Sequence, residues 1–200
     1  THLKKTNRLL LTFGSAWVYE RNGRVVANCH KLPSQQFVRR RMGVEEIVQQ
    51  YTILIQRLLA LQPSLKIVFT VSPIRHLKDG LHENQLSKAT LLMAVEELCE
   101  KFTNVTYFPA YEIVVDELRD YRFYLEDMVH PSSLAVDYIW QRFVDTYMNS
   151  DTQLEMRTLH QLWRDRHHTI LHPTSPEAQK FMQSLQQRIQ QYQVHYPWID

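Results

Sequence analysis

Three short apolar runs along the chain predict β-strands. They cover residues 9–13, 65–71 and 105–108, and a glycine, a serine or a proline follows each run directly. Short continuous apolar runs are typical of strands that have both faces covered inside a parallel sheet. We therefore expect all three strands to be buried.

Two amphipathic helices are predicted between these strands. Residues 44–61 and 86–102 carry apolar side chains at spacings of three and four, which places them on one face of a helix. Alternating strands and helices predict a parallel, doubly wound α/β fold, because each helix crosses over to the start of the next strand. The face predicted for the second helix consists of Leu86, Ala89, Leu92, Met93, Val95, Leu98 and Phe102.

A β-hairpin is predicted directly after the first strand. Asn22-Gly23 lies between two short β-prone runs, residues 17–19 and 24–27. Asn-Gly in this setting is the strongest short-range hairpin signal, because both residues accept a left-handed backbone.

The chain after the third strand predicts more helices. Residues 111–124 predict a short helix and then an irregular stretch. Residues 134–148 predict a longer helix that Ser132 or Ser133 would cap.

The last fifty residues differ in composition. Past Ser150 the chain is rich in glutamine, histidine and arginine, and residues 154–163 and 178–192 predict two further helices. We expect residues 1–150 to form the α/β domain and residues 151–200 to form a helical extension.

Composition narrows the class of protein. The 200 residues are 44% apolar and 22% charged, with 23 basic and 21 acidic side chains. A net charge of +2 gives no electrostatic reason to expect nucleic acid as a partner. The longest basic run, Arg39 to Arg41, is more typical of a solvated face than of a phosphate site. No apolar run reaches the roughly 18 to 20 residues of a membrane span.

The sequence gives only a default localisation. Only Cys29 and Cys99 are present, a spacing that suits a reducing compartment and makes the cytoplasm the default expectation. The sequence begins at Thr1 rather than at a methionine, so we expect a fragment or a processed product, and a leader upstream would change the localisation. The oligomeric state is not predicted.

Polar residues gather where the predicted strands end. Ligands of an open parallel sheet bind beyond the carboxyl ends of its strands. Gly14-Ser15 follows the first strand, residues 72–76 follow the second, and residues 109–112 follow the third.

Asp127 and His130 are the strongest catalytic candidates. Their spacing lets a turn bring the carboxylate to Nδ1 of the imidazole, which leaves Nε2 free as a general base. Two other Asp-x-x-His matches, at residues 79–82 and 165–168, show that the spacing alone is weak evidence. Only Asp127 and His130 precede a proline, a capping serine and a helix.

Other candidates carry competing interpretations. Ser15 follows a strand as a nucleophile would, yet its flanking residues favour a turn serine. Arg75 and His76 either hold a substrate carboxylate or sugar hydroxyl, or bond the backbone of the sheet edge. A zinc site from Cys29, His30, His76 and His130 lacks ligand spacing, so we expect no metal and no other cofactor.

Long stretches of the chain resemble the GSCFA domain family, a branch of the SGNH (GDSL-like) hydrolases. The resemblance spans about residues 3–148. It rests on residues 11–19 (LTFGSAWVY), 26–31 (VANCHK), 70–80 (TVSPIRHLKDG), 107–112 (YFPAYE), 116–124 (DELRDYRFY) and 126–132 (EDMVHPS).

The resemblance implies a flavodoxin-like, three-layer α/β/α hydrolase with a serine nucleophile, in which Asp127 and His130 form the Asp-x-x-His pair. The Gly-Ser-Cys-Phe-Ala motif that names the family, and carries its expected nucleophile, does not occur in these residues. Ser15 is the weaker substitute. Gly14 and Asn28 are candidates for oxyanion binding, and His30, Arg75 and His76 for substrate binding.

The implied reaction is hydrolysis of an ester, with a small-molecule or carbohydrate ester, such as a cell-wall ester, as substrate. Two alternatives remain. One is a binding or interaction module without catalysis. The other is a metal-dependent hydrolase built on His30, His76 and His130.

Overall fold

The computed structural model describes residues 2–27 and 32–196 of the 200-residue chain. The chain divides into two compact units, Thr1–Gln141 and Arg142–Asp200, which are described separately below. The division lies within a helix, α4 (Ser133–Tyr147).

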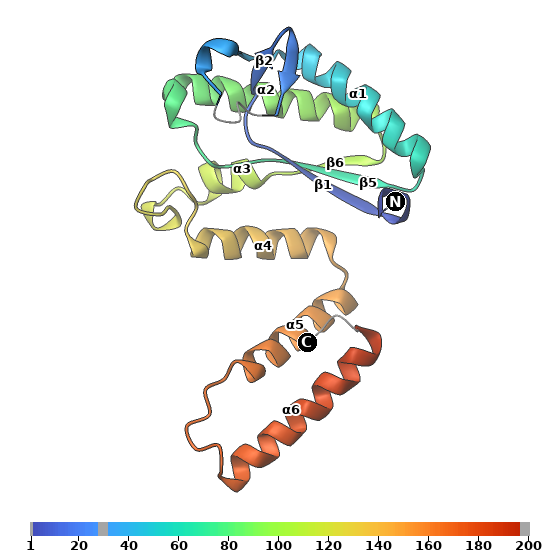
Figure 1. The fold of residues 1–200 in the computed structure, drawn as a ribbon, viewed down its shortest axis with the longest axis vertical. Coiled ribbons are helices and arrows are strands. Elements are labelled where there is room, and N and C mark those ends of the chain that lie inside the picture. Colours follow the sequence, from blue (N-terminus) through green and yellow to red (C-terminus); the bar gives the residue numbers. More distant parts are fainter. Residues whose placement is uncertain (1, 28–31, 197–200) are drawn as a thin grey trace. The chain divides into compact units, whose positions relative to one another are not determined.

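The first unit contains a parallel sheet of three strands in the order β1 (Arg8–Phe13), β5 (Lys66–Val71), β6 (Val105–Phe108). Leu10 pairs with Val68, and Val68 with Thr106. Two long helices, α1 (Val44–Leu61) and α2 (Gly80–Lys101), connect the strands and lie together on one side of the sheet (Figure 1). The α/β class with a parallel sheet is confirmed.

The core lies between this sheet and the two helices. Every second side chain of β5 enters it, because neighbouring side chains of a strand point to opposite faces. Phe69 is fully buried and contacts Phe13 and Tyr51, with ring centroids 5.1 and 5.8 Å away. The most buried members are Ile55, Leu65, Ile67, Phe69, Val71, Ala94, Val95 and Leu98.

Two predictions about burial were wrong. β1 is an edge strand whose exposure alternates, and Leu10 is 53% exposed rather than covered on both faces. In α2, Ala89 is exposed and Met93 is 61% exposed. The buried face instead runs through Asn84, Ser87, Lys88, Leu91, Ala94, Val95 and Leu98. Three polar residues therefore occupy its first turns, which a search for apolar stripes misses.

A second sheet follows β1. The predicted hairpin is confirmed as β2 (Trp17–Arg21) and β3 (Arg24–Val26), and Asn22 and Gly23 have φ angles of +53° and +71° at its turn. A third antiparallel strand, β4 (Val38–Arg41), pairs with β2 and was not predicted. Its three consecutive arginines hid the alternation of a strand.

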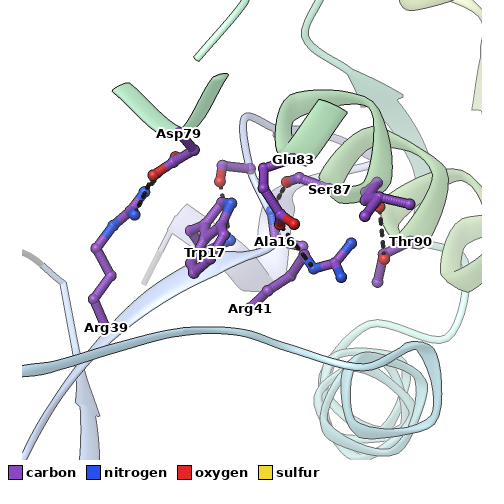
Figure 2. Close-up of polar contacts among 10 residues, drawn as sticks. Ala16, Trp17, Arg39, Arg41, Asp79, Glu83, Ser87 and Thr90 are labelled. Carbon is purple, nitrogen blue, oxygen red and sulfur yellow. Dashed lines mark hydrogen bonds and ion pairs between the residues drawn. The ribbon is translucent and has the colours of Figure 1, made fainter. Parts of the chain in front are cut away.

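Each arginine of β4 contacts a carboxylate on another element. Arg39 forms a two-pronged ion pair with Asp79 before α2, and Arg40 forms one with Glu46 of α1. Arg41 lies 3.8 Å from Glu83 of α2. Figure 2 shows Arg39 and Arg41 pointing from the second sheet to the start of α2. The basic run thus joins the second sheet to both long helices.

The chain after β6 is irregular, as predicted, but contains more turns of helix than expected. A short α3 (Ala110–Glu112) continues into a π-helical turn, η4 (Ile113–Glu117), and a 3₁₀ turn, η5 (Tyr121–Phe123), follows. Other 3₁₀ turns are η1 (His2–Lys5), η2 (Ser34–Gln36) and η3 (Leu77–Asp79). Before α4, the Ser132 hydroxyl accepts a bond from the Ala135 amide, as a cap does.

The second unit contains the two predicted helices, α5 (Ser150–Arg166) and α6 (Pro176–His195). The side chains of Asn149 and Ser175 cap their starts. Arg188 of α6 forms an ion pair with Asp165 of α5 at 2.8 Å. Among the described residues, no helix is long and apolar enough to cross a membrane.

Candidate active site

Lys88 joins the carboxyl ends of β1 and β5. Its Nζ atom lies 2.6 Å from the carbonyl oxygens of Gly14 and Ser72, each of which directly follows a strand. The side chain is almost completely buried, and burial lowers the pKa of its ammonium group to about 8. An ammonium group with two carbonyl acceptors fixes the spacing of the two strand ends.

His76 binds the same strand end. Its Nε2 atom lies 3.0 Å from the Gly14 carbonyl oxygen, and its amide donates to Oδ1 of Asn84. Because a carbonyl oxygen only accepts, Nε2 carries the proton in this contact. Of the two interpretations of His76, the structure places it against backbone. This contact brings together Gly14 and His76, two residues that the sequence predicted for the site.

Ser15 lies in a tight turn. Its hydroxyl accepts a hydrogen bond from the Trp17 amide at 2.9 Å. The Ala16 amide donates to the Ser87 hydroxyl of α2 at 2.8 Å (Figure 2). These contacts are those of a turn serine. In the described part of the chain, no contact joins Ser15 to His130.

Asp127 and His130 form a compact turn. The Nδ1 atom of His130 lies 2.6 Å from Oδ2 of Asp127, and Oδ1 accepts bonds from the amides of Val129 and His130 at 2.9 and 3.0 Å. The His130 amide, the Val129 amide and then the imidazole lower the pKa of Asp127 to about 2. The carboxylate is therefore ionised and held by its own turn, and the His130 side chain is 52% exposed.

The backbone around the pair closes on itself. The Leu125 amide donates to the His130 carbonyl at 2.8 Å, and the Met128 amide donates to Leu125. Met128 has a φ of +60°, a left-handed conformation that is costly for a side chain of this size. This strain is the cost of turning the chain so tightly that Asp127 reaches His130.

Arg75 holds this turn from the end of β5. Its guanidinium donates to the Met128 carbonyl and to the Tyr124 hydroxyl, each at 3.1 Å, and lies 4.7 Å from the centre of the Tyr124 ring. Residues from two predicted loop segments thus meet, as the sequence suggested. Asn28 and His30 lie outside the described residues.

The other two Asp-x-x-His matches have different surroundings. The carboxylate of Asp79 binds Arg39, and that of Asp165 binds Arg188. Within the described structure, each carboxylate pairs with an arginine, and no hydrogen bond joins either one to the histidine three residues on. Within the described residues, neither carboxylate therefore orients an imidazole as Asp127 does.

A cavity of about 520 Å³ lies beside the turn. Met128 and Pro73 line it, whereas Asp127 and His130 do not. Its polar lining includes Arg75, Gln85, Tyr111, Arg119, Tyr121 and Tyr124. The volume lies within the range of about 300 to 1,000 Å³ found for small-molecule sites.

The sequence matches the model of one protein family. The model of the GSCFA family matches residues 1–143, which include every site residue described above. The chain belongs to the GSCFA family. Searches of the curated proteins and of the solved structures gave no match.

Few candidate metal ligands lie close together in the described part of this GSCFA chain. Within residues 2–27 and 32–196, no three histidine, cysteine, aspartate or glutamate side chains are grouped so that they could hold an ion. Cys29 and His30 are outside these ranges. His76 has its Nε2 on Gly14, and His130 has its Nδ1 on Asp127.

Sequence reasoning missed the α2 residues that organise this edge. Asn84, Ser87 and Lys88 are all buried, and each binds a segment that follows a strand. The three residues lie on one face of α2, and Leu91 and Ala94 continue the same face. A polar extension of the apolar stripe was the signal that could have found them.

Proposed function

We propose that this GSCFA chain carries the acid and base machinery of an SGNH-like serine esterase. The observation that supports it most is the Asp127–His130 turn, in which an ionised carboxylate holds Nδ1 at 2.6 Å. A general base needs this arrangement, because the bond at Nδ1 fixes the tautomer that leaves Nε2 able to accept a proton.

The proposed reaction has two halves. Nε2 of His130 takes the proton from a serine hydroxyl while that oxygen attacks the ester carbonyl carbon. The protonated imidazole then gives its proton to the leaving alcohol as the C–O bond breaks, which produces an acyl-enzyme. Water repeats the sequence, with His130 as base, and releases the acid. Asp127 stabilises the imidazolium in both halves.

The nucleophile and the oxyanion donors are part of the proposal. Ser15 is the candidate within these 200 residues, and the alternative is a serine of the family motif that this sequence does not contain. Gly14 and Asn28 are the proposed oxyanion residues, with His30, Arg75 and His76 on the substrate side.

A fluorophosphonate probe tests the proposal, because it reacts only with activated serines. We expect one labelled serine, mapped by peptide mass spectrometry, and loss of labelling in His130→Ala. Removing a triad histidine costs several orders of magnitude in turnover, so hydrolysis of p-nitrophenyl acetate should fall with it. A matched control is His168→Ala, because His168 belongs to an Asp-x-x-His whose carboxylate binds arginine. Equal labelling in His130→Ala would refute the role of His130.

A second candidate function is a binding module without turnover. It is favoured by the Ser15 hydroxyl, which already accepts a bond from the Trp17 amide at 2.9 Å. Ligand binding without any labelled serine would support this alternative, whereas a labelled Ser15 that requires His130 would exclude it.

A further inference from the structure

We propose that the cavity beside the Asp127–His130 turn binds a carboxylated sugar, which would be the alcohol part of the ester. The choice of alcohol rests on the proposed esterase function, but binding of the sugar does not. The charges, the aromatic rings and an amide group of the cavity wall support it.

Arg75 supplies a positive charge that lacks a carboxylate partner. Its contacts in the described part of the chain are a carbonyl, a phenol hydroxyl and the face of the Tyr124 ring. These two hydrogen bonds use two of the five N–H groups of a guanidinium, and the rest remain available. Arginine recognises a planar carboxylate through two parallel hydrogen bonds.

The other charged groups of the wall are already engaged. Arg119 binds Asp116 through a 3.0 Å ion pair, and the carboxylate of Asp120 accepts a bond from the Arg122 amide. Asp120 is the one acidic residue among the described lining residues, and it keeps its negative charge. The lining thus carries two arginines and one carboxylate, and in the described structure Arg75 is the cation of the lining that has no carboxylate partner, so it favours an anion.

The aromatic wall suits a sugar ring. Tyr121 is 78% exposed at the cavity, and Tyr111 and Tyr124 line it with Gln85. Oε1 of Gln85 accepts a bond from the Tyr111 hydroxyl, so its amide NH₂ is oriented by that bond. Phenol rings offer an apolar face with a polar rim, and a sugar presents the matching pattern of C–H faces and hydroxyl edges.

The position of Arg75 connects the cavity to the proposed chemistry. The same guanidinium donates to the carbonyl of Met128, which is the residue after Asp127. A carboxylate bound at Arg75 would therefore lie next to the turn that carries His130. This contact also makes Arg75 a positioning residue for the turn.

Titration calorimetry with three probes tests the inference on the full chain. The probes are trigalacturonate, neutral maltotriose and glucose 6-phosphate. We expect trigalacturonate to bind at least about ten-fold more tightly than maltotriose, since a charge-assisted hydrogen bond contributes about that ratio. Equal affinities would overturn the role of charge. Tighter binding of glucose 6-phosphate would replace the carboxylated sugar by a sugar phosphate.

Two variants and a control locate the site. Arg75→Met should weaken trigalacturonate about ten-fold or more and leave maltotriose unchanged, whereas Tyr121→Ala should weaken both. The matched control is Arg122→Met. Arg122 lies on η5, the 3₁₀ turn that carries Tyr121, but it does not line the cavity. If Arg122→Met lowers affinity as much as Arg75→Met, the assignment is wrong.

The inference and the esterase proposal can fail separately. His130→Ala should bind trigalacturonate like the wild type, because His130 does not line the cavity. Loss of serine labelling in that variant together with intact binding would support both. Labelling that depends on His130 without any sugar binding would overturn only the present inference.

Discussion

The ammonium nitrogen of Lys88 lies 2.6 Å from the carbonyl oxygen of Gly14, 74 residues away in the sequence. The same atom lies 2.6 Å from the carbonyl oxygen of Ser72. One buried side chain of α2 therefore holds the ends of two neighbouring parallel strands.

Lys88→Met should destabilise the fold. The Ser72 carbonyl would lose its donor and the Gly14 carbonyl would keep only His76. The substitution also removes the free-energy cost of burying the ammonium charge, which offsets part of this loss. We expect a net decrease of about 1 to 3 kcal/mol in the free energy of unfolding, measured with urea. Lys101→Met, at a half-exposed position of the same helix, should change it by less than about 0.5 kcal/mol.

Stability should also depend on the proton of Lys88. Its pKa is about 8 in the folded chain and 10.5 in its ordinary state, so between these values the unfolded chain binds more protons. The free energy of unfolding of the wild type should therefore rise from pH 8 toward pH 10.5, relative to Lys88→Met at each pH. Parallel curves for the two proteins would show that Lys88 titrates normally.

The pKa of Asp127 should survive removal of the imidazole. Backbone amides of His130 and Val129 are the largest causes of its lowering to about 2, and the imidazole comes after them. In His130→Ala we expect a pKa that rises but stays below the ordinary 3.8, measured by carbon-13 NMR of the carboxyl. Because the folded pKa is lowered, the contribution of Asp127 to stability is present above pH 3.8 and lost toward pH 2. A value of 3.8 in His130→Ala would mean that the amide bonds do not form.

The arginines of β4 should differ in their effect on stability. Arg39 binds Asp79, whose side chain is 8% exposed, whereas Arg41 reaches a 39% exposed Glu83 at 3.8 Å. Arg39→Met leaves a carboxylate with little water around it and should cost about 1 to 3 kcal/mol. Arg41→Met serves as the matched control and should cost less than about 0.5 kcal/mol. Equal losses in urea denaturation would contradict the difference in burial.

Met128→Gly should stabilise the Asp127–His130 turn. Met128 has a φ of +60°, which glycine adopts without the cost that a Cβ atom brings. We expect a gain of up to about 1 kcal/mol, seen as a rise in Tm. Ala89→Gly, at an exposed position inside α2, should instead lose about 1 kcal/mol. A drop in Tm for Met128→Gly would show that the methionine side chain contributes more packing than its backbone costs.

The sequence predicted the parallel sheet well because its signals are local. The run at β6 and the helix at α1 have the predicted bounds, since apolar spacing alone determines them. β4 was missed because three arginines mask its alternation, and each finds its carboxylate only after folding. The exposure of Leu10 was missed because an apolar run does not encode whether both faces of its sheet are covered.

The site was predictable only where it is formed by a single turn. The contact between Asp127 and His130 follows from a spacing of three residues. The contacts of Lys88 with Gly14 and of Arg75 with Met128 span 74 and 53 residues, and no short-range pattern contains them. Their polar ends bind backbone atoms, which every residue has, so the sequence does not mark the partner.

The outer edge of β1 has a consequence for work with this chain in solution. In a parallel pair the backbone groups of alternate residues point away from the partner, which at β1 leaves those of Arg8, Leu10 and Thr12 on the outer side. A strand edge that also displays an exposed leucine is a template for pairing with other chains. Concentrated samples should therefore self-associate through this edge, and Leu10→Lys should keep them monodisperse in light scattering.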